Sequence, residues 1–416
     1  MARWITADEW PALLGPGRNV YVGASSNEPL GLVEALERAP ERAAGVTFVQ
    51  FPLPGLNRTN FASLHPDARV TTFFMAPQYA SANAGTQSQV EFLPMQMRAV
   101  FDHLSRTAFD VVLVQLGCDR DGRLRFGPNV DFVAAAMRHA RYVVAEVNRG
   151  FVAAAGCPLA PPERFDALVA TDRPLAPMPA SGGDEASAAI GRHIAGLVRD
   201  GACLQTGIGA VPAAVLAALG DKNDLGLHSG LIDDGGMALI RRGVINGRAK
   251  TVDQGLHVAG MALGSAALHE WLADTPEVVF RGADLTHDVG VIRELRGFFS
   301  INSAVQIDLH GQVNAEMVGG RQISGTGGSV DFMRGAKASR GGRSVVALGA
   351  TARSGTLSRI VPAVEMVTAL RTDVDIVVTE FGIAELRDAS AAERAERLIG
   401  IAAPQFRDAL RDGPRP

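Results

Sequence analysis

Residues 201–250 read GACLQTGIGAVPAAVLAALGDKNDLGLHSGLIDDGGMALIRRGVINGRAK, and this stretch decides the expected fold. A short apolar run is followed by a turn at Gly207 and Gly209, and an apolar helical stretch then covers residues 211–219. Proline near the first helical turn, here Pro212, and glycine just after the last turn are typical helix boundaries. The pattern therefore predicts a strand, a glycine turn and a helix in succession.

The start of such a helix is a candidate binding position. Its first backbone N–H groups have no partner within the helix, so they can hold a phosphate, a carboxylate or a developing oxyanion. Taken alone, Gly-x-Gly is weak evidence, because a tight turn with close backbone approach uses the same residues. The surrounding motifs are needed to choose between the two interpretations.

Those motifs resemble the acetyl-CoA hydrolase/transferase family, of the 4-hydroxybutyrate CoA-transferase type. The resemblance covers most of the C-terminal half in the family's order, and the N-terminal half more thinly, through FDVVLVQL and ARYVVAEVNRG. It rests on GIGAVPAAVLAAL, LGLHSGLIDDGG, GVINGRAK, INSAVQIDLHGQVNAEM (301–317), SGTGGSVDFMRGAKASRGGRSVVAL (324–348), VVTEFGIAEL (377–386) and ERAERLIGIAAPQFRDAL (393–410). It implies two tandem open α/β domains with the site in the cleft between them.

The N-terminal half also predicts an α/β fold from its residue pattern. Continuous apolar, β-branched runs alternate with helical patterns, as in a parallel sheet that is covered on both faces. The expected strands are 19–23, 46–51, 70–75, 111–116 and 142–147, and the expected helices are 30–38 and 131–139. The stretch 172–185, rich in Pro, Gly and Ser, predicts a linker, so we expect domains at residues 1–180 and 181–416.

Composition sets limits on the class of protein. The chain has 416 residues, 47% hydrophobic and 20% charged, so two domains can each bury a core. A net charge of −4 with interspersed signs gives no footprint for nucleic acid. The three cysteines show no CxxC spacing, which argues against a disulfide framework or a structural zinc site. We expect no metal.

The same sequence gives no sign of a membrane protein. No apolar run approaches the roughly 20 residues that span a bilayer. The N-terminal residues MARWITADEWPALL carry acids where a signal peptide has its apolar segment. We therefore expect a cytoplasmic protein without membrane or nucleic-acid partners.

The chemistry implied by the resemblance depends on a glutamate. Its carboxylate attacks an acyl-CoA thioester, and a carboxylate or water then resolves the acyl-glutamyl anhydride. The family's LG-(I/L)-H-(S/T)-E segment corresponds here to LGLHSG, so Gly230 occupies the position of the nucleophile. Glycine offers no nucleophile, and double displacement cannot run from this position. Asp233 and Asp234 follow closely, either as substitutes or, the interpretation we favour, as caps of the next helix.

A second departure concerns a position where the family has an asparagine close to the thioester. The segment DLTHDV (284–289) places His287 there. Histidine titrates near neutrality and can act as general base or acid, although a histidine in a surface loop is an equally good interpretation. Glu316, in VNAEM, is the surviving acid of the family pattern and the candidate replacement base.

A third departure lies in the N-terminal half, where QLGCDRDGRLRFG replaces the family's VSPPDEHGYCSLG. Cys118 follows an expected buried strand and is either a thiol nucleophile, with His287 as its partner, or a small core residue. Arg120, Arg123 and Arg125 either bind a carboxylate, whose geometry the guanidinium group matches, or form an exposed turn.

The glycine cluster SGTGGSVDF (324–332) retains the family pattern. Backbone N–H groups in such a cluster can approach a thioester carbonyl without obstruction by side chains. The resemblance implies that Gly327 or Gly328 supplies an amide to the oxyanion, and we include Gly328 among the catalytic residues. The expected binding positions are Gly207, Gly209, Pro212, Gly230, Gly325, Gly327 and Gly328.

These observations predict an enzyme that uses a coenzyme A thioester as substrate, without a tightly bound cofactor. We expect direct acyl transfer to a bound nucleophile, or hydrolysis, in place of a glutamyl intermediate. Two alternatives remain: a conventional CoA-transferase with a displaced carboxylate, and a non-catalytic protein that binds CoA esters. The resemblance also implies a homodimer or homotetramer, with acyl-CoA and a small acceptor as partners.

Overall fold

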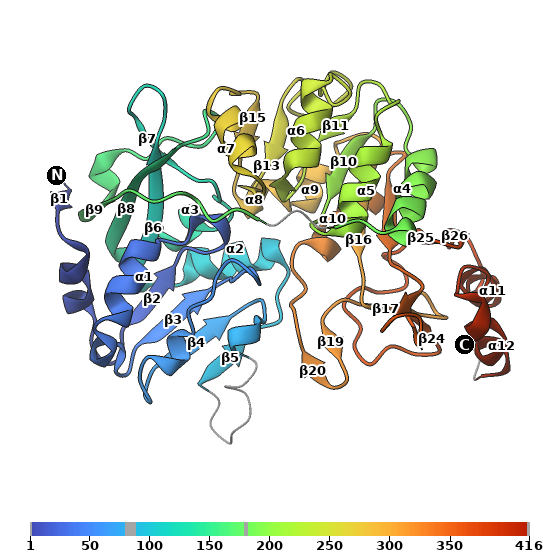
Figure 1. Ribbon diagram of the computed structural model, residues 1–416, viewed down its shortest axis with the longest axis horizontal. Coiled ribbons are helices and arrows are strands. Elements are labelled where there is room, and N and C mark those ends of the chain that lie inside the picture. Colours follow the sequence, from blue (N-terminus) through green and yellow to red (C-terminus); the bar gives the residue numbers. More distant parts are fainter. Residues whose placement is uncertain (1, 80–88, 179–181, 414–416) are drawn as a thin grey trace. The chain divides into compact units, whose positions relative to one another are not determined.

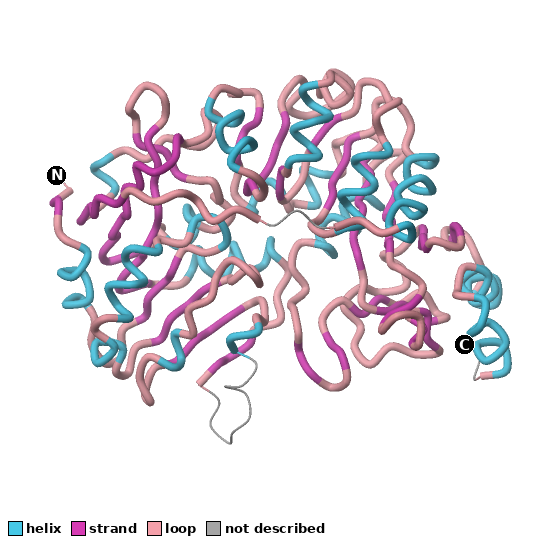
Figure 2. Tube along the Cα trace, viewed as in Figure 1, coloured by secondary structure: helices cyan, strands magenta, loops and turns pink. Residues whose placement is uncertain are grey.

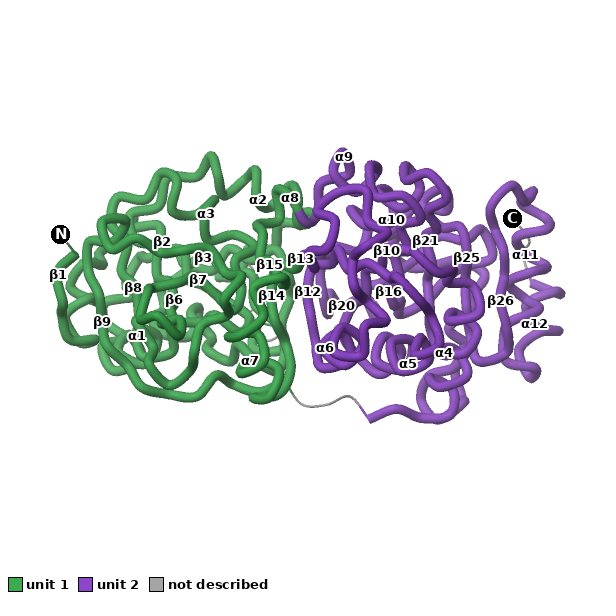
Figure 3. Tube along the Cα trace, turned by 90° about the horizontal axis from the view of Figure 1, so that it is seen from above, with its two compact units in different colours: residues 1–179, 259–285 green, residues 180–258, 286–416 purple. Residues whose placement is uncertain are grey.

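The computed structural model describes residues 2–79, 89–178 and 182–413 (Figure 1). Two compact α/β units are present, shown in different colours in Figure 3. Unit 1 comprises residues 1–179 and 259–285, and unit 2 comprises residues 180–258 and 286–416. The sequence predicted an α/β fold, and that class is confirmed.

The division of the chain differs from a single boundary between residues 180 and 181, because segment 259–285 belongs to unit 1. Backbone hydrogen bonds attach this segment to unit 1: Ala262 N donates to Pro128 O at 2.8 Å, and Phe280 N donates to Gly156 O at 3.1 Å. No local sequence pattern marks such a return of the chain.

Unit 1 is built on a nine-stranded sheet of order β1-β9-β8-β6-β2-β3-β4-β5, with β7 paired to β6. All of these pairs are parallel except β6–β7. The strands are β1 (Arg3–Trp4), β2 (Asn19–Val22), β3 (Thr47–Gln50), β4 (Arg69–Thr72), β5 (Val90–Phe92), β6 (Phe109–Cys118), β7 (Leu124–Phe126), β8 (Ala140–Val152) and β9 (Ala167–Thr171).

Helices of unit 1 flank this sheet (Figure 2). They are α1 (Leu30–Glu37), α2 (Met97–Arg106), α3 (Val133–Ala136) and α7 (Ala266–Ala273), and α8 (Ala283–Thr286) follows. The short strands β14 (Met261–Ala262) and β15 (Val278–Phe280) also belong here. The predicted helix 131–139 is shorter, as α3, and residues 137–139 form a turn. The strand β8 that follows is longer than the predicted strand 142–147.

Unit 2 carries a six-stranded sheet of order β11-β10-β16-β21-β25-β26, in which only the last pair is antiparallel. Its strands are β10 (Cys203–Thr206), β11 (Gly226–Leu227), β16 (Phe298–Ser303), β21 (Arg343–Ala347), β25 (Ile376–Thr379) and β26 (Gly382–Glu385). The helices are α4 (Glu185–Leu197), α5 (Ala210–Ala218), α6 (Asp234–Arg241), α9 (Val289–Ile292), α10 (Ser329–Ala338), α11 (Ala391–Gly400) and α12 (Arg407–Asp412).

Short strands complete the unit. They are β12 (Leu231–Ile232), β13 (His257–Ala259), β17 (Gln306–Asp308), β18 (Val313–Asn314), β19 (Met317–Val318), β20 (Arg321–Gln322), β22 (Thr351–Ala352), β23 (Leu357–Ser358) and β24 (Ile360–Val361). The predicted strand, glycine turn and helix are confirmed as β10, the turn and α5. Gly209 lies there with φ of 112°, a conformation that favours glycine.

A buried carboxylate connects the strands of unit 2 to a helix. Asp375, just before β25, accepts hydrogen bonds from Lys337 Nζ at 2.7 Å, Arg387 Nη2 at 2.6 Å and Ser344 N at 3.0 Å. Burial raises the pKa of Asp375, but the hydrogen bonds from Arg387 and Lys337 outweigh burial and hold that pKa below its ordinary value.

We expect Asp375→Asn to lower the free energy of unfolding by about 3 kcal/mol, because it leaves two cations without their counter-ion. The folded-state pKa lies below the unfolded one, so this stabilisation is present above the unfolded value of 3.8 and is lost as the pH falls through the folded value. Urea unfolding at pH 7 and pH 3 measures both effects. Asp373→Asn, which removes an ion pair to the exposed Arg334, is the control and should cost under about 1 kcal/mol. An equal loss in both variants would contradict the prediction.

Candidate active site

His287 lies in unit 2 and is buried, with only 1% of its surface exposed. Its Nδ1 is 2.8 Å from the hydroxyl oxygen of Thr286, and its ring centroid is 4.5 Å from that of Phe332 in α10. The interpretation of this residue as an exposed loop histidine is therefore wrong. A hydrogen bond on one side and an aromatic ring on the other hold the imidazole in one orientation.

The other ring nitrogen of His287 faces two glycines. An ideal Cβ on Gly230 would lie 3.2 Å from Nε2, and an ideal Cβ on Gly328 would lie 2.3 Å from it. Gly328 has an ordinary negative φ, so its backbone conformation would allow a side chain. The imidazole of His287 is what excludes one. The structure thus brings together three positions that the sequence analysis selected separately.

His287 is a neutral imidazole at ordinary pH. Burial, with a smaller contribution from the nearby His228, lowers the pKa of His287 to about 3. His228 Nε2 lies 3.1 Å from the carbonyl oxygen of Thr286, which can only accept, so that nitrogen carries hydrogen. A histidine with such a low pKa is a poor general base, which disfavours that role for His287. Where the Thr286 hydroxyl donates to Nδ1, Nε2–H of His287 becomes a donor toward the glycines.

The glycine loop ends at the start of α10, close to this nitrogen. Gly327 has φ of 56°, and Gly328 is the N-cap residue of α10. The loop is held by Glu316, whose two carboxylate oxygens accept the hydroxyls of Thr326 and Thr368, each at 3.0 Å. Glu316 is buried, and both of its oxygens are already occupied. This favours a role in holding the loop over the role of a free base.

The turn after β10 approaches the same region. The hydroxyl of Ser229 donates to the carbonyl oxygen of Thr206 at 3.1 Å, so the residue before Gly230 contacts the end of β10. The remaining candidate positions lie in two places: Gly207, Gly209 and the buried Pro212 at the start of α5, and the buried Gly325 in the glycine loop.

A buried polar pair joins two apolar strands; Asn302 matches a position of the family pattern, but Gln205 was not expected from the sequence. Gln205 of β10 and Asn302 of β16 exchange side-chain hydrogen bonds of 3.2 Å in both directions, and Asn302 Nδ2 also donates to Ser300 Oγ at 2.8 Å. The signal that could have found Gln205 is a buried amide among apolar strand residues, since such a group needs a partner.

Two acids near Gly230 were weighed as replacement nucleophiles. Asp233 is the N-cap residue of α6, and its carboxylate accepts the backbone N–H of Gly236 at 2.8 Å. Asp234 is the first residue of the same helix. The capping interpretation is confirmed for Asp233.

Cys118 is the last residue of β6 and is half-buried. It belongs to unit 1 and His287 to unit 2, so their partnership stays a prediction. The neighbouring arginines hold carboxylates of the chain itself: Arg125 lies 2.7 Å from Asp119, and Arg120 lies 2.9 Å from Asp274.

Arg123 also pairs with Asp119, at 3.0 Å. Burial raises the pKa of Asp119, but hydrogen bonds from Arg125 and Arg123 lower it to about 2, so this carboxylate stays ionised. These arginines therefore pair with carboxylates of the chain itself, and Arg120 and Arg123 are exposed, as the alternative of an exposed turn predicts.

Within residues 2–79, 89–178 and 182–413, no group of three or more His, Cys, Asp or Glu side chains is placed to hold a metal ion. In the same described part of the chain, no helix has the length and apolar character needed to cross a membrane.

The fold matches that of CoA-transferase structures over almost the whole chain. RipA from Yersinia pestis is 32% identical with a TM-score of 0.90, and 4-hydroxybutyrate CoA-transferase from Porphyromonas gingivalis is 33% identical with a TM-score of 0.81. Both similarities cover 99% of this chain and 96% of the other chain.

Sequence comparison then identifies the family. The model of the acetyl-CoA hydrolase/transferase C-terminal domain matches residues 264–413. The 4-hydroxybutyrate coenzyme A transferase of Clostridium kluyveri is 34% identical over 411 residues, 98% of this chain and 96% of that protein. The chain belongs to the acetyl-CoA hydrolase/transferase family. Its relatives are CoA-transferases and acetyl-CoA hydrolases, so this protein is an enzyme of that family, whose substrates are CoA thioesters.

Proposed function

We propose that this enzyme cleaves an acyl-CoA thioester without a glutamyl intermediate, by direct acyl transfer to a bound nucleophile or by hydrolysis. One observation carries the proposal: at the position where the resemblance implies the nucleophilic glutamate, Gly230 faces a buried imidazole, 3.2 Å from where its Cβ would be. The ring of His287 occupies space that a carboxylate side chain would have to enter.

The reaction we propose needs no group on the enzyme to become acylated. Water or an acceptor attacks the thioester carbonyl carbon, the carbonyl π electrons move to oxygen, and the C–S bond breaks as the carbonyl re-forms. The thiolate of CoA leaves and takes up the proton that the nucleophile loses. The backbone N–H of Gly328 and Nε2–H of His287 would donate to the developing oxyanion. A neutral, oriented imidazole suits this role, because donors aimed in advance cost no reorganisation during the reaction.

The conventional transferase would need another carboxylate as its nucleophile. Asp233 caps α6, and both oxygens of Glu316 accept threonine hydroxyls. Each of these acids would have to give up hydrogen bonds before it could attack a thioester. These existing hydrogen bonds favour direct acyl transfer or hydrolysis over CoA exchange through a displaced carboxylate.

The partners we propose are small molecules, an acyl-CoA and an acceptor. Binding would involve the glycines of the loop (Gly325, Gly327, Gly328) and of the turn before α5 (Gly207, Gly209), together with Pro212. Cys118 stays a proposed nucleophile of second choice. A homodimer or homotetramer and a cytoplasmic location stay predictions.

Trapping with borohydride in the presence of acyl-CoA tests the proposal. We expect thiol release from at least one acyl-CoA of a chain-length panel, and no reduced glutamyl or aspartyl residue by peptide mass mapping. A family member that retains the glutamate is the positive control for trapping.

Two other outcomes would instead identify a conventional transferase or a non-catalytic binding protein. An adduct on Glu316, Asp233 or Asp234 would establish the conventional transferase. Saturable binding of acyl-CoA by calorimetry, without thiol release to any nucleophile, would identify a non-catalytic binder.

A further inference from the structure

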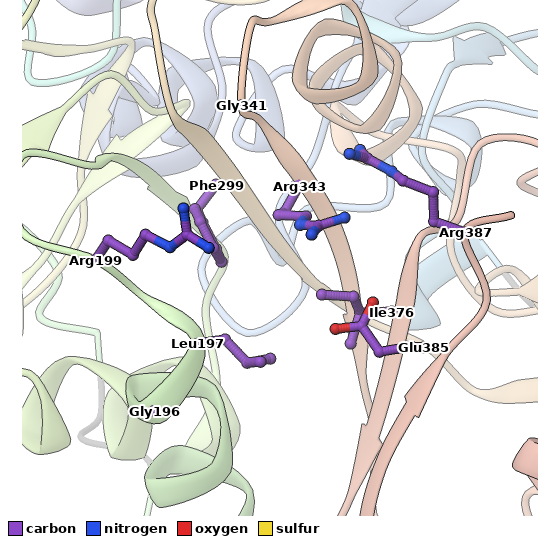
Figure 4. A pocket seen from close by; sticks show the side chains of 9 residues that line it. All are labelled: Gly196, Leu197, Arg199, Phe299, Gly341, Arg343, Ile376, Glu385 and Arg387. Carbon is purple, nitrogen blue, oxygen red and sulfur yellow. The ribbon is translucent and has the colours of Figure 1, made fainter.

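A pocket in unit 2 lies at the amino ends of the parallel strands (Figure 4). Arg343 is the first residue of β21, Ile376 is the first residue of β25, and Phe299 is the second residue of β16. Leu197, the last residue of α4, also lines it, and the cavity volume is about 310 Å³. The glycine turn after β10 lies at the opposite, carboxyl edge of the same sheet, so this pocket is separate from it.

Three arginines line the pocket, and they differ in their partners. Arg387 is committed to Asp375 and to the carbonyl oxygen of Gly342 at 2.9 Å. Arg199 and Arg343, within the described residues, make no side-chain hydrogen bond or ion pair. Figure 4 shows the guanidinium group of Arg199 beside the ring of Phe299, and that of Arg343 directed toward Arg387 and Glu385. Both arginines line the same cavity. Arg199 is exposed and Arg343 half-buried, so solvent reaches the pocket from the side of Arg199.

The charge of the pocket is not balanced by its own residues. Glu385, the last residue of β26, is the one acid among the lining residues, and it forms no ion pair within 4.0 Å in the described structure. Two uncommitted guanidinium groups therefore share a cavity with one carboxylate. Each guanidinium group matches a pair of phosphate or carboxylate oxygens, and two of them lining one cavity are suited to an anion with several oxygens.

We propose that this pocket binds a small dianion whose negative charges lie on oxyanion groups, held by Arg199 and Arg343. The volume is at the lower end of the range for small-molecule sites, roughly 300–1,000 Å³, and exceeds what a single oxyanion group needs. Phe299, Leu197 and Ile376 supply an apolar wall for the organic part of the ligand. A phosphate monoester and a dicarboxylate share this chemistry. The site lies outside the proposed thioester chemistry and does not rest on it.

Calorimetric titration of the full chain with phenyl phosphate, inorganic phosphate and succinate, at matched ionic strength, tests this site. We expect saturable binding, with phenyl phosphate tighter than inorganic phosphate because of the apolar wall. Arg199→Gln and Arg343→Gln should each weaken binding at least about tenfold, the loss expected for a charge-assisted hydrogen bond. Glu385→Gln should tighten it, because it removes the repelling charge.

Arg248→Gln is the matched control, since Arg248 is an exposed arginine of unit 2 that does not line the pocket. It should bind phenyl phosphate as the wild type does, and circular dichroism melting should show that every variant is folded. Binding of succinate with no binding of phosphates supports the site and assigns its ligand as a dicarboxylate. Two results would overturn the inference: no saturable binding of any probe, or equal losses in Arg248→Gln.

Discussion

The double variant Gly230→Glu/His287→Asn is expected to gain acyl-CoA:acetate exchange and a borohydride-sensitive glutamyl adduct. The substitutions restore the carboxylate and the amide that the resemblance implies at these positions. We expect exchange at least about a hundredfold above wild type, a small share of the roughly 10⁴–10⁶ that the loss of a nucleophile costs in other enzymes. Exchange of labelled acetate into acyl-CoA measures the gain.

The single variants separate the two contributions. Gly230→Glu alone should gain little, because its Cβ would lie 3.2 Å from His287 Nε2 and the rest of the side chain would have to pass the ring. His287→Asn alone should also gain little, because it opens space beside residue 230 but provides no nucleophile. Gly230→Gln/His287→Asn is the control, with the same shape and no carboxylate. A folded double variant without exchange would show that this region is not an inherited thioester site.

The second large effect is expected for His287→Ala. Loss of an oxyanion donor lowers kcat by roughly 10²–10³, and we expect a loss of that size in thiol release. Because burial lowers the pKa of His287 to about 3, its imidazole is neutral above about pH 4. The activity of the wild type should therefore show no decline from protonation of this residue near pH 6.5. Steady-state rates from pH 5 to pH 9 check both statements.

Phe332→Leu provides the control for His287→Ala. It removes the ring that packs 4.5 Å from His287 but leaves the donor, so we expect less than about a tenfold loss. If wild-type activity declines with an apparent pKa near 6.5 and His287→Ala abolishes that decline, the histidine acts as a general base and the donor role is wrong.

Local patterns predicted much of the fold. The alternation of apolar runs and helical stretches placed β2, β3, β6 and β10 within one to three residues of their observed ends, and the glycine turn before α5 is where it was expected. The predicted helix 131–139 is shorter in the structure, Val133–Ala136, because an apolar helical pattern does not show where the chain must turn to enter a strand. That depends on packing against the rest of unit 1.

The site was predicted in part. Gly230 and Gly328 were selected from motifs, and the structure places both beside His287. The exposed turn that we favoured for the arginines after Cys118 fits Arg120 and Arg123, which are exposed. Their partners, Asp119 nearby and Asp274 far along the chain, cannot be assigned from spacing.

The sequence alone establishes that residue 230 offers no nucleophile, because glycine has no side chain that could attack a thioester, whatever its place in the fold. Turn and strand patterns are likewise local, since they follow from backbone conformation and side-chain periodicity. The neutrality of His287 and the pocket between Arg199 and Arg343 follow from folding, because burial and the pairing of charges depend on residues far apart in the chain. Desolvation sets the proton affinity of an imidazole, and no sequence motif encodes how much water the folded chain removes from it.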